Sequence, residues 1–378
     1  MFVKPVAAMN NSRMPLLDDL DRLGLAEMLD SLPPPQRSPA YVRMAQLDRC
    51  DLVTSRLLKF FVFGSTVSAD SLPKRVVEEL EPIVDSGFCM FDDGKVRLAN
   101  LTLTHIDGLW YFSQMPTPGA TLYFGADSLA LINRLSGFRG KALDLCSGPG
   151  IIGLVLARRG ADVVGGEINP IAVSLARLNA VMNGLEDRYS ARLGDLYDVV
   201  AETEKYDFVV ANPPLLPIPT DVAYPFVGNG GPLGVDVIGR LVGECGRVLR
   251  EDGYLQTLGG TLLRDGNLLW QEQLEELARS QGLRIRVTIT GSGDLRSQGN
   301  WCRMLAWTIL AQNNMEPRGA AVTQLAEELE VGYDGVADEV CFYYLRADRG
   351  TPSVSVVNLV GNGRVNAGGW FVQAGAAT

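Results

Sequence analysis

An alternation of strand-like and helix-like segments from Lys141 onward constrains the fold of this chain more than any other feature. The pattern predicts strands at residues 141–146, 162–167, 188–193, 206–211, 252–259, 284–290 and 301–310, with helices at about 150–159, 170–183, 233–249 and 264–281. Alternation of this kind predicts a mostly parallel sheet with helices on both faces. We therefore expect an α/β domain that contains these seven strands.

A glycine-rich turn follows the first of these strands. It comprises the residues from Ser147 to Gly150, and an apolar helix is expected to begin at Ile151. Glycines let the backbone pass close to a ligand and enter a helix without a Cβ clash. Glu167 ends the next strand, at the same carboxyl edge of the sheet. A carboxylate there can accept hydrogen bonds from both hydroxyls of a ribose, and ligands bind at this edge of open α/β sheets.

The same turn also fits a dinucleotide-binding motif. Residues from Gly148 to Gly153 match the GxGxxG pattern, which is weak when it occurs alone. The motif begins in the middle of the chain, and the fourth strand ends in Asn212-Pro213-Pro214. Both features disfavour a dinucleotide site.

The first 115 residues follow a different order. Helices are expected at 16–32, 52–62 and 74–84, and two short strands within 91–114. Helix, turn, helix and a strand pair is the order of a winged helix. The segment 74–84 carries at least as many acidic as basic residues, which disfavours DNA binding. The alternative is a dimerisation module or a lid over the substrate. Such a module would affect substrate binding or assembly rather than cofactor binding.

Residue counts exclude several kinds of site. The net charge of −10 argues against a broad phosphate-binding face, so a nucleic acid is not an expected partner. His105 is the only histidine, and the six cysteines include no CxxC pair, so we expect no bound metal. We expect His105 to lie in the wing without a catalytic task, and Cys146 to be a small packing residue.

The same sequence features predict the compartment and the domain division. No secretory signal and no run of ~20 uncharged apolar residues is present, so we expect a cytoplasmic protein with no membrane span. Near the C-terminus, a helix at 319–330 and strands near 339–346 and 353–360 are expected, followed by a Gly/Ala-rich tail. We divide the chain into an N-terminal module (1–115), the α/β domain (116–312) and a C-terminal extension (313–378).

Several segments together resemble one known family. They read LDLCSGPGIIGLVLA (143–157), VVGGEINPIAVSLARLNAVMNG (163–184), LGDLYD (193–198) and YDFVVANPPLLP (206–217). They are similar to class I S-adenosylmethionine (SAM)-dependent methyltransferases, within the Asn-Pro-Pro branch that includes protein-glutamine N5- and N6-adenine methyltransferases. The segments TLYFGADSLALINRL (121–135) and GNGGPLGVDVIGRLV (228–242) extend the resemblance over about 120–312. It implies a Rossmann-like, seven-stranded domain that binds SAM.

The resemblance also implies roles for individual residues toward the cofactor. The implied contacts are Asp144, Ser147, Gly148 and Gly150 with the methionine part, Glu167 with the ribose, Ile168, Asn169, Asp195 and Leu196 with the adenine, and Asn212 at the reacting end. Asp195 could also cap the residues that follow it, and the two roles can coexist.

Asn212, Pro213 and Pro214 would face the acceptor. In the family, the Asn side chain and the first Pro carbonyl accept hydrogen bonds from a planar NH2 group, which aims the nitrogen lone pair at the methyl group. The branch usually has an aromatic residue next, whereas this chain has Leu215. Tyr224 or Phe226, in the following loop, could supply a ring instead.

We expect a SAM-dependent methyltransferase that acts on nitrogen in a small molecule or in a peptide or protein side chain. The Leu215 departure leaves a second use of SAM open: cyclisation to azetidine-2-carboxylate with release of methylthioadenosine, or aminocarboxypropyl transfer. A catalytically silent regulatory protein on the same fold is a third reading. A homodimer through the N-terminal module also stays open.

Overall fold

The computed structural model describes residues 13–30, 51–114, 120–122, 124–135, 139–313 and 315–360. The chain forms two compact units. Unit 1 comprises Met1–Ile132 and Ser136–Val199, and unit 2 comprises Asn133–Leu135 and Val200–Thr378. The expected domain boundary at 115/116, the proline-rich end of the first helix and the Gly/Ala-rich tail lie outside the described residues.

Unit 1 begins with short helices. The segment predicted as one helix at 16–32 contains two, because Gly24 has a left-handed φ of 72° and ends the first of them. The segment predicted at 74–84 is also divided, since a new helix begins at Glu81 with Pro82 in its first turn. The elements are α1 (Pro15–Arg22), α2 (Leu25–Asp30), α3 (Leu52–Leu57), η4 (Leu58–Val62), η5 (Ala69–Ser71), α4 (Lys74–Glu78) and α5 (Glu81–Asp85).

Four strands, rather than the expected two, occupy residues 89–114. They are β2 (Cys89–Asp92), β3 (Lys95–Leu98), β4 (Leu101–Ile106) and β5 (Leu109–Gln114), and β1 (Val67–Ser68) completes a sheet in the order β1-β3-β2. Asp93-Gly94 and Asp107-Gly108 all have positive φ, as the tight turns of β-hairpins require. These two Asp-Gly pairs were the sequence signal for two hairpins.

The β4–β5 hairpin lies in the interior of unit 1. All residues of β4 are buried, and His105 places its Nδ1 atom 3.0 Å from Asp30 Oδ2 and packs against the Trp110 ring. The N-terminal helices, the hairpin and the inner face of helix α8 (Pro170–Met182) form one apolar cluster. The N-terminal elements therefore share a core with the α/β part of the same unit.

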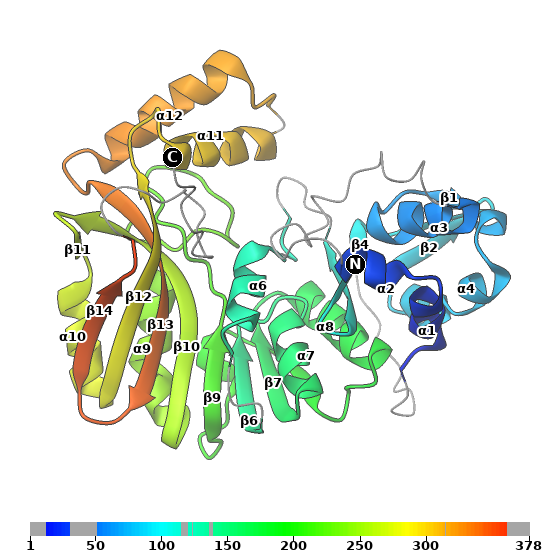
Figure 1. Cartoon of the computed structure of the whole chain (residues 1–378), viewed down its shortest axis with the longest axis horizontal. Helices are drawn as coiled ribbons and strands as arrows, with labels where there is room; N and C mark the ends of the chain where they lie inside the picture. Colours follow the sequence, from blue (N-terminus) through cyan, green and yellow to red (C-terminus); the bar gives the residue numbers. More distant parts are fainter. Residues whose placement is uncertain are drawn as a thin grey trace. The chain divides into compact units, whose positions relative to one another are not determined.

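The α/β part of unit 1 has three parallel strands (Figure 1). These are β6 (Gly140–Leu145), β7 (Ala161–Glu167) and β8 (Tyr189–Leu193), and α7 (Ile151–Arg158) and α8 connect them. Each element begins and ends within one or two residues of its prediction. The crossover connections bring the carboxyl ends of β6, β7 and β8 to one edge.

Unit 2 contains a mixed sheet in the order β14-β12-β13-β10-β9. The strands are β9 (Tyr206–Ala211), β10 (Leu249–Arg264), β12 (Leu283–Asp294), β13 (Glu339–Arg349) and β14 (Ser353–Asn358), with β11 (Asn267–Leu268) paired to β10. β9 and β10 are parallel, and β13 lies antiparallel between β10 and β12. Helices α9 (Asp236–Val248) and α10 (Gln271–Gln281) cover one face of this sheet (Figure 1).

The strand predicted at 301–310 was wrong, because this segment is helix α11 (Asn300–Gln312). Its buried residues are Trp301, Cys302, Leu305, Ala306, Ile309 and Leu310, while Met304 and Trp307 are exposed. Burial that recurs every three to four residues is the helical period, which the apolar composition of the segment had hidden. α11 packs against α12 (Gly319–Tyr333).

The fold is mixed α/β with a mostly parallel sheet, as predicted. Among the described residues, we find no helix that is long and apolar enough to cross a membrane.

Candidate functional site

The glycine-rich turn between β6 and α7 is tight. Cys146, Gly148 and Gly150 have φ angles of 55°, 53° and 85°, and the Gly150 N–H donates to Ser147 O at 2.8 Å. A non-glycine residue such as Cys146 rarely adopts this left-handed region. The Gly150 N-cap offers no side-chain hydrogen bond to α7, so the backbone N–H groups there depend on other partners.

Glu167 lies directly against this turn, as the sequence predicted. Its Oε2 accepts a hydrogen bond from Gly148 N and its Oε1 accepts one from Asn169 N, both at 2.8 Å. Each carboxylate oxygen has a second lone pair that these bonds leave available. The side chain is only half-buried, so Glu167 can accept further hydrogen bonds from a ligand.

Asp144 lies beneath the turn and is fully buried. Its Oδ2 accepts a hydrogen bond from Gly153 N at 2.8 Å, but its Oδ1 has no partner among the described residues. Burial raises the pKa of Asp144 to about 8, and the Glu167 charge adds to this shift. A buried acceptor without a partner costs ~1–3 kcal/mol. A hydrogen-bond donor on a ligand, such as an ammonium group, would satisfy this oxygen.

We expect this carboxyl to make stability without cofactor depend on pH. Its pKa in the folded protein lies above the ordinary 3.8, so the stabilisation is complete below about pH 4 and is lost as the pH rises through about 8. The melting temperature of the wild type, relative to that of Asp144→Asn, should therefore fall as the pH rises over that range. Asp162→Asn, at an exposed site on β7, is the control. If the melting temperatures of the wild type and Asp144→Asn change with pH by the same amount, the raised pKa of Asp144 is wrong.

Tyr189 forms the floor of the same site, which the sequence interpretation missed. Its ring and hydroxyl lie where a Cβ on Gly150, Gly153 or Gly165 would have to be, at 2.8 Å from the hydroxyl for Gly150 and 2.5 Å from the ring for Gly153. Ser147 lies next to the hydroxyl, although the two oxygens do not meet hydrogen-bond geometry. The nearby glycines were the signal in the sequence, but only the fold brings Tyr189 beside them.

The residues predicted around the adenine lie at the ends of β7 and β8. Asn169 caps α8 by accepting a hydrogen bond from Ile171 N at 3.0 Å, and Ile168 is exposed. Asp195 precedes the short helix η6 (Leu196–Val199), whose Leu196 is buried. Leu193, which the sequence interpretation did not name, is 58% exposed at this edge. Apolar surface for a flat ring is thus offered by Ile168 and Leu193 rather than by Leu196.

The Asn-Pro-Pro segment belongs to unit 2 and follows β9. Thr257 Oγ1 donates to Ala211 O at 2.9 Å and fixes the end of that strand. Asn212 is half-buried there, followed by buried Pro213 and half-buried Pro214. The backbone that carries Asn212 therefore begins at a fixed strand end.

The glycine-rich segment from 228 to 234 supports this turn. Leu216 N donates to Gly228 O at 2.9 Å, and Gly230 N donates back to Leu216 O at 3.0 Å. A Cβ on Gly230 would lie 2.9 Å from Leu215 Cα, so the two backbones can approach only because residue 230 is glycine. This close approach explains the glycine at position 230.

The three residues predicted to contact the acceptor differ in exposure. Leu215 is 4% exposed, so its side chain belongs to the core of unit 2. Tyr224 is partly buried beside Thr308, and burial raises its pKa. Phe226 is 67% exposed and is the ring most accessible to a ligand.

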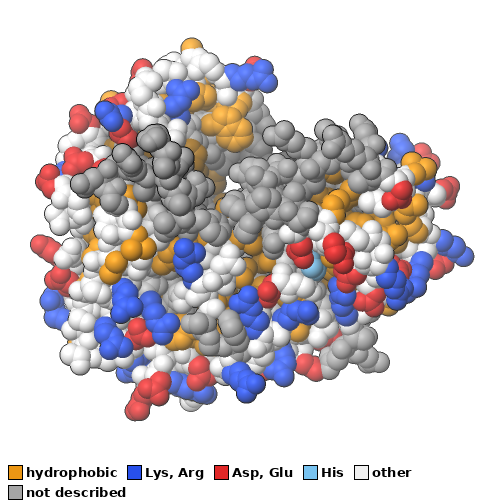
Figure 2. Space-filling model, viewed as in Figure 1, with side chains coloured by type: hydrophobic (Ala, Val, Ile, Leu, Met, Phe, Trp, Pro, Cys, Tyr) orange, Lys and Arg blue, Asp and Glu red, His pale blue; other side chains and the backbone are white. Residues whose placement is uncertain are grey.

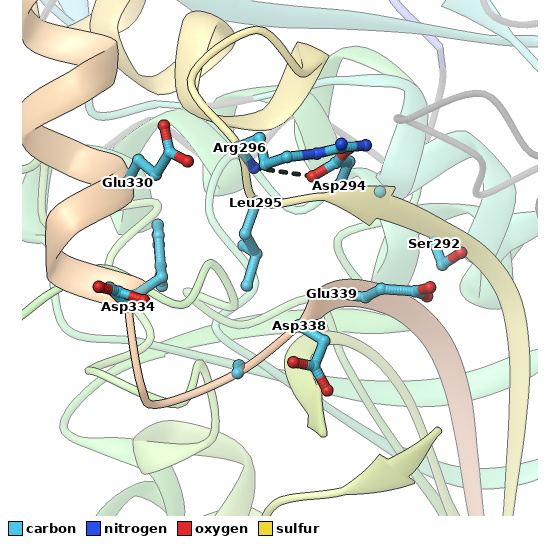
Figure 3. A pocket seen from close by; sticks show the side chains of 11 residues that line it. Ser292, Asp294, Leu295, Arg296, Glu330, Asp334, Asp338 and Glu339 are labelled. Atoms are coloured by element: carbon cyan, nitrogen blue, oxygen red, sulfur yellow. Dashed lines mark hydrogen bonds and ion pairs between the residues drawn. The ribbon is translucent and has the colours of Figure 1, made fainter. Parts of the chain in front are cut away.

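A cavity of roughly 590 Å³ opens beyond the end of β12 (Figure 3). Its lining includes the acidic residues Asp294, Glu330, Asp334, Asp338 and Glu339, together with Arg296, which is paired with Asp294. Tyr333, another lining residue, donates from its hydroxyl to Pro217 O at 2.6 Å and so connects the cavity wall to the segment after Asn-Pro-Pro. Carboxylates around the opening would repel phosphate. Elsewhere, Figure 2 shows acidic and basic side chains interspersed on the face that it displays.

The described part of the chain contains no cluster of His, Cys, Asp or Glu side chains that could hold a metal ion. The described cysteines are free, and four of the five are buried. Burial raises the pKa of the Cys89 thiol to about 11, which disfavours a thiolate nucleophile there.

Comparison with known proteins gives consistent matches. The family model "Methyltransferase small domain" matches residues 124–283. A provisionally named protein N5-glutamine methyltransferase of Methanocaldococcus jannaschii is 33% identical over 142 residues, which are 36% of this chain and 70% of that protein. A ribosomal protein uL3 glutamine methyltransferase of Burkholderia pseudomallei is 30% identical over 31% of this chain and 43% of that protein. The chain thus spans less than half the length of the second relative.

A tRNA1(Val) (adenine(37)-N6)-methyltransferase of Porphyromonas gingivalis is 41% identical over 19% of this chain and 31% of that protein. Among solved structures, a ribosomal protein L11 methylase of Lactobacillus delbrueckii subsp. bulgaricus is 20% identical, with 42% of this chain and 68% of that chain covered and a TM-score of 0.31. Structural similarity at this level carries no information about function.

Proposed function

This chain belongs to the class I SAM-dependent methyltransferases of the methyltransferase small domain family, and from that premise we propose that it methylates nitrogen in a small molecule or in a peptide or protein side chain. The glutamine methyltransferases among its relatives support an amide-type acceptor. The adenine methyltransferase among its relatives supports a nucleobase as the second candidate acceptor. The acidic net charge and the acidic cavity favour a protein or small-molecule acceptor over a nucleic acid.

One observation carries the cofactor part of the proposal: Glu167 and Asp144 meet at the glycine turn, each with an oxygen able to accept more hydrogen bonds. We assign the buried Asp144 to the ammonium end of the cofactor and Glu167 to its ribose. The turn residues Ser147, Gly148 and Gly150 would line the methionine part. Asp195, together with the exposed side chains of Ile168 and Leu193, would bound the adenine.

SAM supplies a methyl group on a sulfonium, which is already an activated leaving group. The residues of the chain therefore mainly orient the acceptor, which can contribute on the order of 7–11 kcal/mol. The Asn212 side chain and the Pro213 carbonyl would accept hydrogen bonds from an acceptor NH2 and hold its lone pair in one direction. No strong base is needed, which is consistent with a chain that has a single histidine.

Phe226 is the ring that we propose to cover a flat acceptor, because Leu215 is buried. We expect Phe226→Ala to raise the KM for the acceptor by roughly 5–150-fold, since stacking on a base-like ring is worth ~1–3 kcal/mol. The Kd for SAM should be unchanged. Steady-state kinetics and calorimetry measure both quantities, with Phe91→Ala, an exposed ring on β2, as the control. An unchanged KM would remove Phe226 from the acceptor site.

The experiment that tests the function is incubation with SAM, alone and with acceptors, followed by separation of the products. Glutamine-containing peptides, free small amines and adenine-containing RNA form the acceptor panel. Acceptor-dependent S-adenosylhomocysteine supports methyl transfer. Methylthioadenosine formed without an acceptor would instead support intramolecular use of SAM. SAM binding with neither product would support a regulatory protein.

The N-terminal elements support a winged-helix-like module. The order of α3, β1, α4, α5, β2 and β3, with the sheet order β1-β3-β2, is compatible with that architecture. We propose that this module contributes to acceptor binding or to a homodimer, and size-exclusion chromatography with light scattering tests the dimer. Acidic Glu81 and Asp85 in α5 make a DNA-reading role unfavourable.

A further inference from the structure

The side chain of Asn179, on α8, connects two segments that are far apart in the sequence. Its Oδ1 accepts a hydrogen bond from Phe112 N at 2.8 Å, and its Nδ2 donates to Phe112 O and to Pro149 O, each at 2.9 Å. Asn179 is fully buried. Both amide hydrogens are therefore used, one on strand β5 and one on the glycine turn.

Asn183, one helical turn later, makes the matching contacts without reaching the glycine turn. Its Oδ1 accepts a hydrogen bond from Trp110 N at 3.1 Å, and its Nδ2 donates to Trp110 O at 2.7 Å and to Asn179 O at 2.8 Å. Residues 110 and 112 are the ones whose backbone groups face α8 rather than β4. The two asparagines thus pair with the free edge of β5 as a neighbouring strand would.

The bond to Pro149 O distinguishes Asn179 from Asn183. Pro149 is the residue between Gly148, whose N–H donates to Glu167, and Gly150, whose N–H donates to Ser147 O. Fixing the Pro149 carbonyl fixes the peptide plane that leads into Gly150. The position of the turn beneath the cofactor therefore depends on a side chain that β5 also holds.

We propose that Asn179 is a positioning residue through which the N-terminal hairpin sets the affinity of the chain for its cofactor. The proposal rests on the proposed function for the identity of that cofactor. It also extends the role of the N-terminal module, which the sequence linked only to substrate or assembly. Because the coupling of two sites is reciprocal, binding at the turn must in turn stabilise β5.

The matched pair Asn179→Ala and Asn183→Ala tests this role. Each variant loses one pair of hydrogen bonds to β5, at Phe112 for Asn179→Ala and at Trp110 for Asn183→Ala, so both should melt at lower temperature than the wild type. Only Asn179→Ala should also weaken SAM and S-adenosylhomocysteine binding, by roughly 5–150-fold in calorimetry. Equal losses of affinity in the two variants, or no loss in Asn179→Ala, would show that Asn179 is only structural.

Amide hydrogen exchange of the full chain tests the same role in a second way, and its first measurement uses the wild type alone, so it still decides the question if Asn179→Ala does not fold. In the wild type, S-adenosylhomocysteine should slow exchange at Trp110 and Phe112, and unchanged exchange there would overturn the proposal. Without cofactor, Asn179→Ala should speed exchange at Gly148 and Gly150, and Asn183→Ala should not. The measurement without cofactor tests whether Asn179 positions the turn, whatever the cofactor is. Failure of the wild type to bind SAM would contradict the proposed function and would leave that result unaffected.

Discussion

Asn212→Ala is expected to lower kcat by a factor of about 10²–10³, the usual loss when a preorganised polar group at a reacting centre is removed. The side chain follows β9, whose end is fixed by the bond between Thr257 and Ala211. Its carbonyl oxygen would orient the acceptor nitrogen and would not hold the cofactor. The Kd for SAM should therefore stay within about threefold, as measured by calorimetry beside single-turnover kinetics.

Asn229→Ala is the matched control for this variant. Asn229 lies in the segment that pairs with Leu216, and its Oδ1 accepts a hydrogen bond from Gly231 N at 2.9 Å. Its loss perturbs the support of the Asn-Pro-Pro turn without removing an acceptor of the substrate NH2. If Asn212→Ala keeps full turnover, or if both variants lose the same activity, the Asn-Pro-Pro segment is a structural turn in this chain.

The meeting of the glycine turn and Glu167 could be predicted from the sequence because it depends on the order of neighbouring elements. Strands β6 and β7 are parallel neighbours, so a turn after one and an acid at the end of the other must share an edge. The observed bond from Gly148 N to Glu167 Oε2 is the direct result. The alternation of elements predicted this part of the fold for the same reason.

Contacts between distant segments could not be predicted in this way. Tyr189 and Asn179 reach the turn from β8 and α8, and nothing local in the sequence marks which atoms they meet. The burial of the hairpin is hidden similarly, because β4 alternates apolar residues with threonine and histidine, as a half-exposed strand does, yet it is buried on both faces. The strand predicted at 301–310 was wrong for the opposite reason. The local composition of this segment resembles a strand, and only the pattern of burial in the fold shows the helical period of α11.

Glu167→Ala should weaken SAM binding at least tenfold, because each hydrogen bond to a charged group is worth roughly 1.5–3 kcal/mol. In the proposed complex, the carboxylate accepts hydrogen bonds from both ribose hydroxyls. It already accepts bonds from Gly148 N and Asn169 N, so its removal also releases the turn. Calorimetry measures the change, and Asp162→Ala, which removes an exposed carboxylate from the same strand, should bind SAM as the wild type does.

A cofactor analogue that lacks the ribose 2′-hydroxyl separates the two effects of Glu167→Ala. If Glu167 binds the ribose, the wild type should bind the 2′-deoxy analogue of S-adenosylhomocysteine more weakly than the parent, and Glu167→Ala should bind the two alike. The coupling energy of this cycle is then ~1–3 kcal/mol, because the two changes remove the same contact. If Glu167 only holds Gly148 and Asn169, the two losses add, since the hydroxyl then interacts with another group. Additive losses would therefore show that Glu167 does not bind the ribose and that it only holds the turn.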